Sequence, residues 1–190
     1  MRIGLFGGSF NPIHTGHITL GKTMLRVMCL DEVWYMVSPQ NPWKVSAELL
    51  DEQKRLTMVQ TALEGEEGLR ASDYEFHLPR PSYTWNTLQH LKQDLPDAEF
   101  VLIIGGDNWA QFDKWAHYEE ILAQHEVAVF PREGAQIDKT TLPDNVTVVD
   151  VPLVNVTSTQ LREMIRRGED IAAFVPEEVE RVIKNKSYYL

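Results

Sequence analysis

Apolar residues along the chain recur in two alternating patterns, one typical of buried strands and the other typical of helices. Short runs rich in β-branched and aromatic residues indicate strands, and apolar residues spaced three and four apart indicate helices. The expected strands are a first one containing Ile3, Leu5 and Phe6, followed by residues 32–37, 69–78, 99–104, 127–130 and 146–149. The expected helices begin near Thr15, Asp51, Ser82 to Thr84, Glu119, Thr157 and Pro176.

This alternation of strand and helix predicts a parallel sheet with helices on both faces, the doubly wound, Rossmann-like α/β class. The length of 190 residues suits a single domain, with residues 157–190 forming a C-terminal helical part. In such sheets, ligands bind beyond the carboxyl ends of the strands. We therefore expect residues 7–17, 38–44 and 105–115, which follow three of the strands, to meet in one crevice.

Composition and charge narrow the range of partners. The chain has 18 basic and 28 acidic residues and a formal net charge of −10. This argues against a nucleic-acid partner, because binding a phosphate backbone requires a basic face. No targeting or membrane-spanning run is apparent, which predicts a cytoplasmic protein. The single cysteine, Cys29, excludes an internal disulfide framework and follows the apolar pattern of the first helix, so we expect it to be buried.

Residues 2–17 combine a strand, a glycine-containing turn and a helix start. Such a helix start offers free N–H groups and the positive end of the helix dipole to a phosphate. We expect Thr15 to cap the helix. His14 and His17 lie three positions apart, so both imidazoles can face the same volume and donate hydrogen bonds to phosphate oxygens.

Other interpretations of this stretch remain. Two histidines at this spacing could share a metal ion, but no nearby carboxylate or cysteine pattern completes a ligand set, so we expect no metal site. One histidine could instead be a cap or a core residue, with the glycines serving only the turn. The stretch lacks both the Lys-Ser/Thr pair of the P-loop and the G-x-G-x-x-G spacing of dinucleotide-binding folds.

Two further segments carry groups suited to phosphate. Lys44 lies at the end of a loop with two prolines that follows strand 32–37, where a solvated surface lysine is the alternative. Ser158, Thr159 and Arg162 lie at a helix start, where a cation is unfavourable unless an anion binds there. Their hydroxyl, N–H and guanidinium groups would clamp a polyphosphate. A capped helix with a surface arginine is the alternative.

The motifs resemble those of a known superfamily. Gly7-Gly8-Ser9-Phe10-Asn11-Pro12-x-His14-x-Gly16-His17 is similar to the nucleotidylyltransferase signature with its H-x-G-H core, and Ser158-Thr159-x-x-Arg162 is similar to the second signature. Within the superfamily, the chain most resembles the bacterial nicotinate mononucleotide adenylyltransferases almost from end to end. The shared segments include Pro39-x-x-Pro42-x-Lys44, Pro81-Ser82-Tyr83-Thr84-x-x-Thr87-Leu88 and Ile104-Gly105-x-Asp107 with Trp115. The chain departs from the usual pattern at residues 41–44, at Val156-Thr157 and at Ala116.

The resemblance implies transfer of the AMP moiety of ATP to nicotinate mononucleotide, giving nicotinate adenine dinucleotide and pyrophosphate. The attacking phosphate is already ionised, so catalysis requires positioning and charge stabilisation rather than a general base. The resemblance also implies that Mg²⁺ enters with ATP. It implies catalytic roles for His14, His17, Lys44 and Arg162; ATP binding by Gly7, Gly8, Ser9, Phe10, His14, His17, Gly105, Asp107, Ser158, Thr159 and Arg162; and acceptor binding by Ser9, Lys44, Tyr83, Thr84, Trp115 and Ala116.

The same motifs are compatible with other functions. Nicotinamide mononucleotide or phosphopantetheine could be the acceptor, and cytidylyl transfer would use the same H-x-G-H motif. A nucleotide-binding regulator without catalysis is the alternative from another class. The sequence leaves open whether the chain forms a homo-oligomer.

Overall fold

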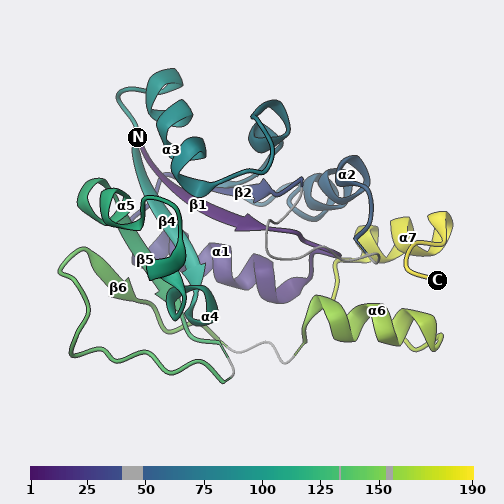
Figure 1. Cartoon of the computed structure of the whole chain (residues 1–190). Helices are drawn as coiled ribbons and strands as arrows, with labels where there is room; N and C mark the ends of the chain where they lie inside the picture. Colours follow the sequence, from purple (N-terminus) through teal and green to yellow (C-terminus); the bar gives the residue numbers. More distant parts are fainter. Residues whose placement is uncertain (40–48, 133, 153–155) are drawn as a thin grey trace.

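The computed structural model describes residues 1–39, 49–132, 134–152 and 156–190, and within them six strands form one parallel sheet (Figure 1). The strand order is β3-β2-β1-β4-β5-β6, and every neighbouring pair is parallel. The strand order reverses between β1 and β4, because β2 and β3 are added on one side of β1 and β4, β5 and β6 on the other. Ligands bind at this position in such folds. The strands are β1 (Arg2–Gly8), β2 (Glu32–Val37), β3 (Leu69–Ser72), β4 (Glu99–Gly105), β5 (Glu126–Phe130) and β6 (Val146–Val148).

Helices cover both faces of the sheet, as predicted, and Figure 1 shows α1 and α3 on opposite sides of it. None of the helices in the described ranges is long and apolar enough to cross a membrane. The α-helices are α1 (Thr15–Val27), α2 (Glu52–Ala62), α3 (Thr84–Asp94), α4 (Gly106–Trp109), α5 (Tyr118–Gln124), α6 (Ser158–Arg166) and α7 (Glu177–Lys186), with short 3-10 helices η1 (Tyr74–His77) and η2 (Phe112–Lys114).

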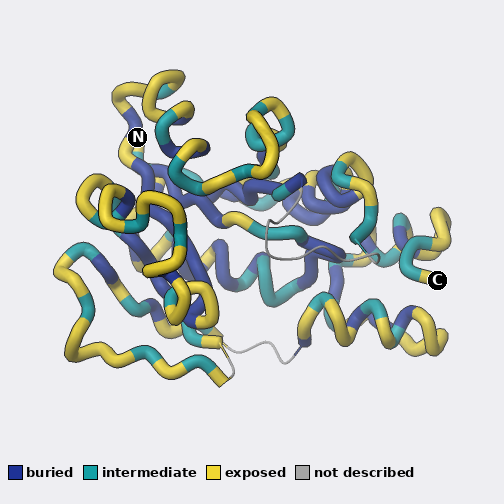
Figure 2. The backbone as a smooth tube through the Cα atoms, in the orientation of Figure 1, coloured by how far each residue is buried: buried dark blue, intermediate teal, exposed yellow. Residues whose placement is uncertain are grey.

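The two faces of the sheet form two separate hydrophobic clusters. Successive side chains of a strand point to opposite faces, so Leu5 packs in one cluster and Phe6 in the other. The cluster around Phe6 contains residues of α1, α2, α6 and α7, so the C-terminal helices share a core with the sheet. The cluster around Leu5 contains residues of α3 and α5. Figure 2 shows the buried residues concentrated in the sheet and the exposed ones on the outer helices and loops.

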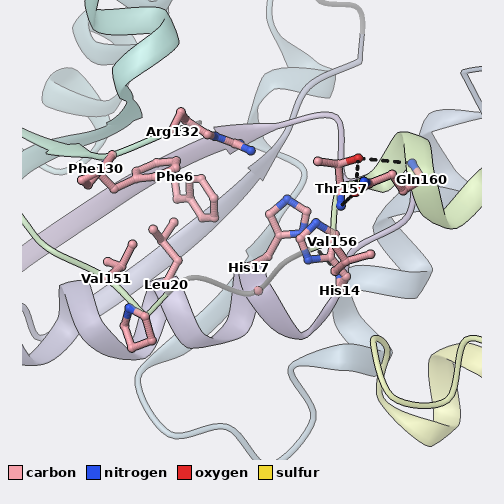
Figure 3. Close-up of a pocket in the computed structure, with 13 residues that line it drawn as sticks. Phe6, His14, His17, Leu20, Phe130, Arg132, Val151, Val156, Thr157 and Gln160 are labelled. Atoms are coloured by element: carbon pink, nitrogen blue, oxygen red, sulfur yellow. Dashed lines mark hydrogen bonds between the residues drawn. The ribbon is translucent and has the colours of Figure 1, made fainter. Parts of the chain in front are cut away.

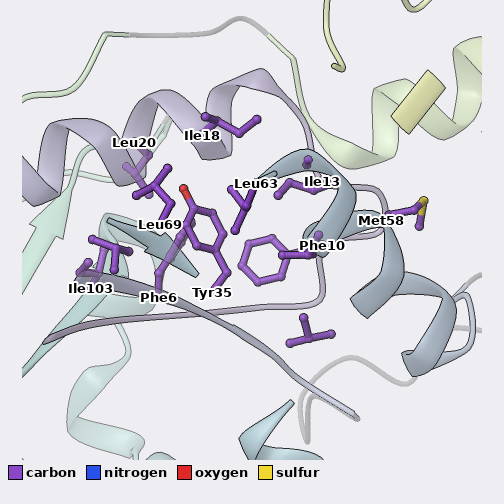
Figure 4. Packing of buried hydrophobic residues seen from close by; sticks show 14 of the residues in the cluster. Phe6, Phe10, Ile13, Ile18, Leu20, Tyr35, Met58, Leu63, Leu69 and Ile103 are labelled. Atoms are coloured by element: carbon purple, nitrogen blue, oxygen red, sulfur yellow. The ribbon is translucent and has the colours of Figure 1, made fainter. Parts of the chain in front are cut away.

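Helix α1 is tied to the sheet by a side chain of β2. The hydroxyl of Tyr35 donates a hydrogen bond to the carbonyl oxygen of His17 at 2.9 Å. This approach requires Gly21, because a Cβ atom there would collide with the Tyr35 hydroxyl. Figure 4 shows the Tyr35 ring among the buried side chains of Phe6 and Phe10. The first turn of α1 is therefore fixed relative to the carboxyl end of the sheet.

Three local expectations were wrong. The strand expected over residues 69–78 ends at Ser72, whose hydroxyl accepts a hydrogen bond from the N–H of Tyr74 as the chain turns into η1. The N-cap of α1 is His14 rather than Thr15. Cys29 is exposed, because α1 ends at Val27 and Cys29 lies in a left-handed turn with φ of 50°. The apolar spacing continues past the point where the backbone leaves the helix.

Candidate functional site

A cavity of about 390 Å³ lies between the carboxyl ends of β1 and β5 and the N-terminus of α1 (Figure 3). A cavity of this size with one apolar wall and a few convergent polar groups suits a small organic ligand. The apolar side chains are Phe6, Leu20, Phe130, Val151 and Val156, and the polar ones are His14, His17, Arg132, Thr157 and Gln160, with Gly16, Pro131 and Pro152 completing the lining.

The two histidines of the H-x-G-H stretch lie against each other at this cavity. Their ring centroids are 3.7 Å apart, with the planes tilted by 33°. The main-chain N–H of His14 donates to Nδ1 of His17 at 3.2 Å. Because Nδ1 of His17 accepts this bond, the neutral ring carries its proton on Nε2, which is then a donor. Nδ1 of His14 is buried and has no hydrogen-bond partner within the described chain.

Both imidazoles are neutral at pH 7. Burial, and to a lesser extent the nearby charge of Arg132, lowers the pKa of His14 to about 4. Burial also holds the pKa of His17 well below its usual value, and His14 and Arg132 act in the same direction. The pair therefore offers hydrogen-bond donors, rather than fixed positive charges, to a ligand that enters the cavity.

Arg132 is a site residue that the sequence analysis missed. It lies two residues beyond β5, and its guanidinium stacks over the ring of Phe130 at 5.2 Å. Its Nε lies 3.9 Å from Oδ1 of Asp107. A Cβ atom at Gly105 would lie only 3.0 Å from Cγ of Arg132 and would also crowd Asp107, so the glycine permits this grouping. The predicted residues Gly105 and Asp107 are thus linked to the cavity through Arg132.

The two glycines at the end of β1 have different surroundings. Gly7 is exposed, and nothing lies within 4 Å of the position a Cβ atom would take. At Gly8, a Cβ atom would lie 2.9 Å from the ring of Phe10. Phe10 has a positive φ of 44° and is buried, with ring contacts to Phe6 at 5.4 Å and to His17 at 5.2 Å. Its side chain belongs to the core, which leaves its main chain for any contact with ATP.

The start of α6 contacts the same loop. Thr157 caps the helix by accepting a hydrogen bond from the N–H of Gln160 at 3.2 Å. Ser158 donates from its hydroxyl to the carbonyl oxygen of Pro12 at 2.9 Å, and Arg162 donates from Nη1 to that of Asn11 at 2.9 Å. Nη2 of Arg162 also lies 3.4 Å from the hydroxyl of Thr159. In the first helical turn, the N–H groups of Ser158 and Thr159 have no acceptor within the helix and can face a ligand, whereas that of Gln160 is used by Thr157.

Four of the residues predicted to bind the acceptor, Tyr83, Thr84, Trp115 and Ala116, lie on two segments that are joined by a ring contact. Trp85, next to Thr84, stacks on His117, two residues beyond Trp115, with ring centroids 5.3 Å apart. Tyr83 and Ala116 are exposed, and Trp115 packs against Phe112. These residues do not line the cavity beside the histidines.

Two further predictions concern the role of Lys44 and the presence of a metal site. Lys44 lies outside the described residues. No group of three or more His, Cys, Asp or Glu side chains in the described ranges is placed to hold a metal ion.

Comparisons with known proteins agree on one family. Residues 5–164 match the family model described as Cytidylyltransferase-like. A probable nicotinate-nucleotide adenylyltransferase of Bacteroides fragilis (strain YCH46) is 48% identical and covers 96% of this chain and 92% of its own length. The protein of the same name from Cytophaga hutchinsonii is 44% identical and covers 100% of this chain and 98% of its own length.

A solved structure confirms the fold. The Plasmodium falciparum nicotinic acid mononucleotide adenylyltransferase complexed with NaAD superposes with a TM-score of 0.84 over 99% of this chain and 97% of its own. Its sequence identity is 18%, so the likeness supports the Rossmann-like α/β architecture alone.

The lowered pKa of His14 predicts a pH-dependent stability. The unfolded chain binds this proton at a pH near 6.5 and the folded chain only near 4. The free energy of unfolding should therefore fall as the pH drops from about 6.5 to 4, by on the order of 3 kcal/mol from this residue. We expect His14→Gln to show a flatter dependence in urea unfolding across this range. Exposed His90→Gln is the control and should follow the unsubstituted protein; an equal slope for His14→Gln would contradict the assignment.

Proposed function

This chain belongs to the Cytidylyltransferase-like family and, within it, to the nicotinate-nucleotide adenylyltransferases, and we propose how its residues carry out that reaction. The enzyme transfers the AMP moiety of ATP to nicotinate mononucleotide and releases pyrophosphate. The observation that carries the assignment of the site is the neutral histidine pair, which lies at a helix start and beside a cavity large enough for a nucleotide.

The reaction makes one bond to the α-phosphorus of ATP and breaks another. An oxygen of the acceptor's 5′-phosphate attacks this phosphorus, and the oxygen that bridges to the β-phosphate leaves with pyrophosphate. The nucleophile is already ionised at pH 7, so no proton has to be removed from it. The protein contributes by holding the two phosphates in line and by donating hydrogen bonds to the charge that develops.

His17 is placed to donate to the α-phosphate. Its Nδ1 accepts from the N–H of His14, which leaves Nε2–H as the donor of a ring that lines the cavity. The His14 ring lies beside it at 3.7 Å between centroids, with an unpartnered Nδ1 within the described chain. Ligand phosphates would also favour the protonated form of either ring, because an opposite charge raises the pKa of an imidazole.

We assign the cavity to the adenosine part of ATP. Phe6, Phe130 and Val151 provide an apolar wall of the kind that suits a base. The planar guanidinium of Arg132 lies at the same wall, beside the carboxylate of Asp107. This carboxylate can accept hydrogen bonds from ribose hydroxyls. The N–H groups at the start of α6, with Ser158, Thr159 and Arg162, are assigned to the triphosphate. ATP enters as its Mg²⁺ complex, since Mg²⁺ is commonly held by nucleotide phosphates.

We assign the acceptor to the region where the ring contact between Trp85 and His117 joins the first turn of α3 to the segment after η2. We propose that the pyridine ring lies against Trp115 and that its carboxylate meets the main-chain N–H groups near Thr84 and after Trp115. Two N–H donors suit the two oxygens of a carboxylate, whereas a carboxamide would turn an NH₂ group toward one of them. Lys44 keeps its predicted role at the acceptor phosphate, and the cytoplasmic location stays a prediction.

The function is tested by pyrophosphate release from ATP and Mg²⁺ with nicotinate mononucleotide, nicotinamide mononucleotide or phosphopantetheine as acceptor. We expect turnover with the nicotinate compound. A donor left unpaired costs about 1–3 kcal/mol, so kcat/KM for the nicotinamide compound should be roughly one to two decades lower. Equal values for the two mononucleotides would refute the proposed acceptor contacts and leave adenylyl transfer standing. Turnover with phosphopantetheine alone would refute the function.

His17→Ala should lower kcat by roughly 10²–10³, the usual value of one donor that acts on developing charge. Circular dichroism and thermal unfolding should show a folded protein, because the His17 ring is at the cavity edge rather than in the centre of the core. His90→Ala, at an exposed position, is the matched control and should retain full turnover. Near-normal kcat for His17→Ala would remove this residue from the mechanism.

Arg132→Met should raise KM for ATP roughly tenfold, equivalent to about 1.4 kcal/mol of binding free energy. KM for nicotinate mononucleotide should change less than about twofold, a difference of about 0.4 kcal/mol, because the acceptor residues lie elsewhere. Steady-state kinetics with each substrate varied separately would measure both constants. Arg70→Met is the control, since Arg70 is exposed and stacks on Trp34 at 4.9 Å, away from the cavity lining. A change confined to the acceptor constant would show that Arg132 is assigned to the wrong substrate.

A further inference from the structure

Arg55 of α2 is completely buried, and within the described residues its guanidinium donates hydrogen bonds only to main-chain carbonyl oxygens. Nε donates to Leu50 at 2.7 Å. Nη1 donates to both Ser9 at 2.6 Å and Ser38 at 2.9 Å. Nη2 donates to Pro39 at 3.3 Å. One guanidinium thus donates hydrogen bonds to carbonyl oxygens of three separate segments of the chain.

Two of these segments begin at the carboxyl ends of neighbouring strands. Ser9 follows the last residue of β1, and Ser38 follows the last residue of β2. The N–H of Ser38 also donates to the carbonyl oxygen of Gly8 at 2.9 Å, which continues the pairing of the two strands by one step. Only arginine has donors spread in a planar fork wide enough to reach carbonyl oxygens on several sides. Arg55 therefore sets the distance between the two loops as they leave the sheet.

The burial of this charge is costly for stability. Among the described residues, no carboxylate lies within salt-bridge distance of Arg55, and its charge is met by carbonyl dipoles. Burial lowers the pKa of Arg55, while Tyr189, Glu52 and Asp51 act in the opposite direction. Taking a cation out of water costs several kcal/mol, and apolar residues of similar volume are often as stable or more stable at such positions. Packing alone does not explain an arginine here.

A chain of contacts links Arg55 to the second signature of the family. Leu50 accepts from Arg55 through its carbonyl oxygen and donates from its N–H to Oδ1 of Asn11 at 3.2 Å. The carbonyl oxygen of Asn11 accepts from Arg162 at 2.9 Å. Helices α2 and α6 therefore hold the loop after β1 from two sides, and its position depends on both.

We infer that Arg55 is a positioning residue for adenylyl transfer, which holds Ser9 after β1 at a fixed separation from Ser38 and Pro39 after β2. The inference rests on the proposed function and on the expected contact of Ser9 with nicotinate mononucleotide. Arg55 itself touches no substrate. An in-line attack is sensitive to geometry, and a displacement of about 1 Å can cost up to roughly 10² in rate.

The test compares Arg55→Lys, Arg55→Met and Val59→Ala. Lysine keeps the charge but has a single ammonium group in place of the fork, and methionine removes both charge and donors. Val59 is also completely buried in α2, so Val59→Ala is a matched control that weakens the same helix without touching a loop carbonyl. Thermal unfolding is measured first, and all kinetics are run well below the lowest unfolding midpoint.

We expect kcat/KM for nicotinate mononucleotide to fall roughly tenfold in Arg55→Lys and roughly a hundredfold in Arg55→Met. KM for ATP should stay near that of the unsubstituted enzyme in both variants, because the cavity beside the histidines does not include Arg55. Val59→Ala should lower the unfolding midpoint and leave the kinetic constants unchanged. Hydrogen exchange at the N–H groups of Leu50 and Ser38 should accelerate in the Arg55 variants and not in Val59→Ala.

Two kinetic results would overturn the inference. One is unchanged kinetic constants in a folded Arg55→Lys or Arg55→Met, and the other is equal losses for ATP and the acceptor. If neither Arg55 variant folds, Arg55 is a core residue only and the inference is wrong. Failure of the unsubstituted enzyme to use nicotinate mononucleotide would instead refute the proposed function, and accelerated exchange at Leu50 and Ser38 would still report the loop contacts.

Discussion

The loop between β1 and α1 is held in place by hydrogen bonds to its main-chain carbonyl oxygens. Arg55 of α2 reaches Ser9, Arg162 of α6 reaches Asn11, and Ser158 of α6 reaches Pro12. The loop has no regular secondary structure of its own, so these donors satisfy groups that a helix or strand would otherwise pair. The main-chain position of Ser9 and Asn11 in this loop therefore depends on donors that lie 46 and 151 residues away in the sequence.

Much of the fold follows from local pattern. The continuous apolar run at residues 99–104 predicts a strand buried on both faces, and β4 is buried at every position from Phe100 to Gly105. Alternating strands and helices are enough to predict the parallel sheet. The prediction errors occur where the apolar spacing continues but the backbone conformation changes. Cys29 is an example, because it continues the spacing of α1 although it lies in a turn with positive φ.

The candidate site was only partly predictable. His14 and His17 form a local motif, and the spacing of three places their rings together. Arg132 follows a strand just as the predicted loops do, so the same rule applied to residues 127–130 would have found it. Arg55 gave no signal, because an arginine in an amphipathic helix is normally solvated. Its contacts with Ser9, Ser38 and Pro39 arise only when three segments meet in space.

The uncharged state of the two histidines also determines how substrates first approach the enzyme. Both substrates are anions, and the chain has a net charge of −10, so its long-range field repels them. Electrostatic screening at physiological ionic strength confines that repulsion to about 8 Å. Neutral imidazoles add nothing to attraction at a distance. Substrate recognition therefore depends on how well the substrate fits the site after contact. This dependence disfavours binding of the many other anions in a cell.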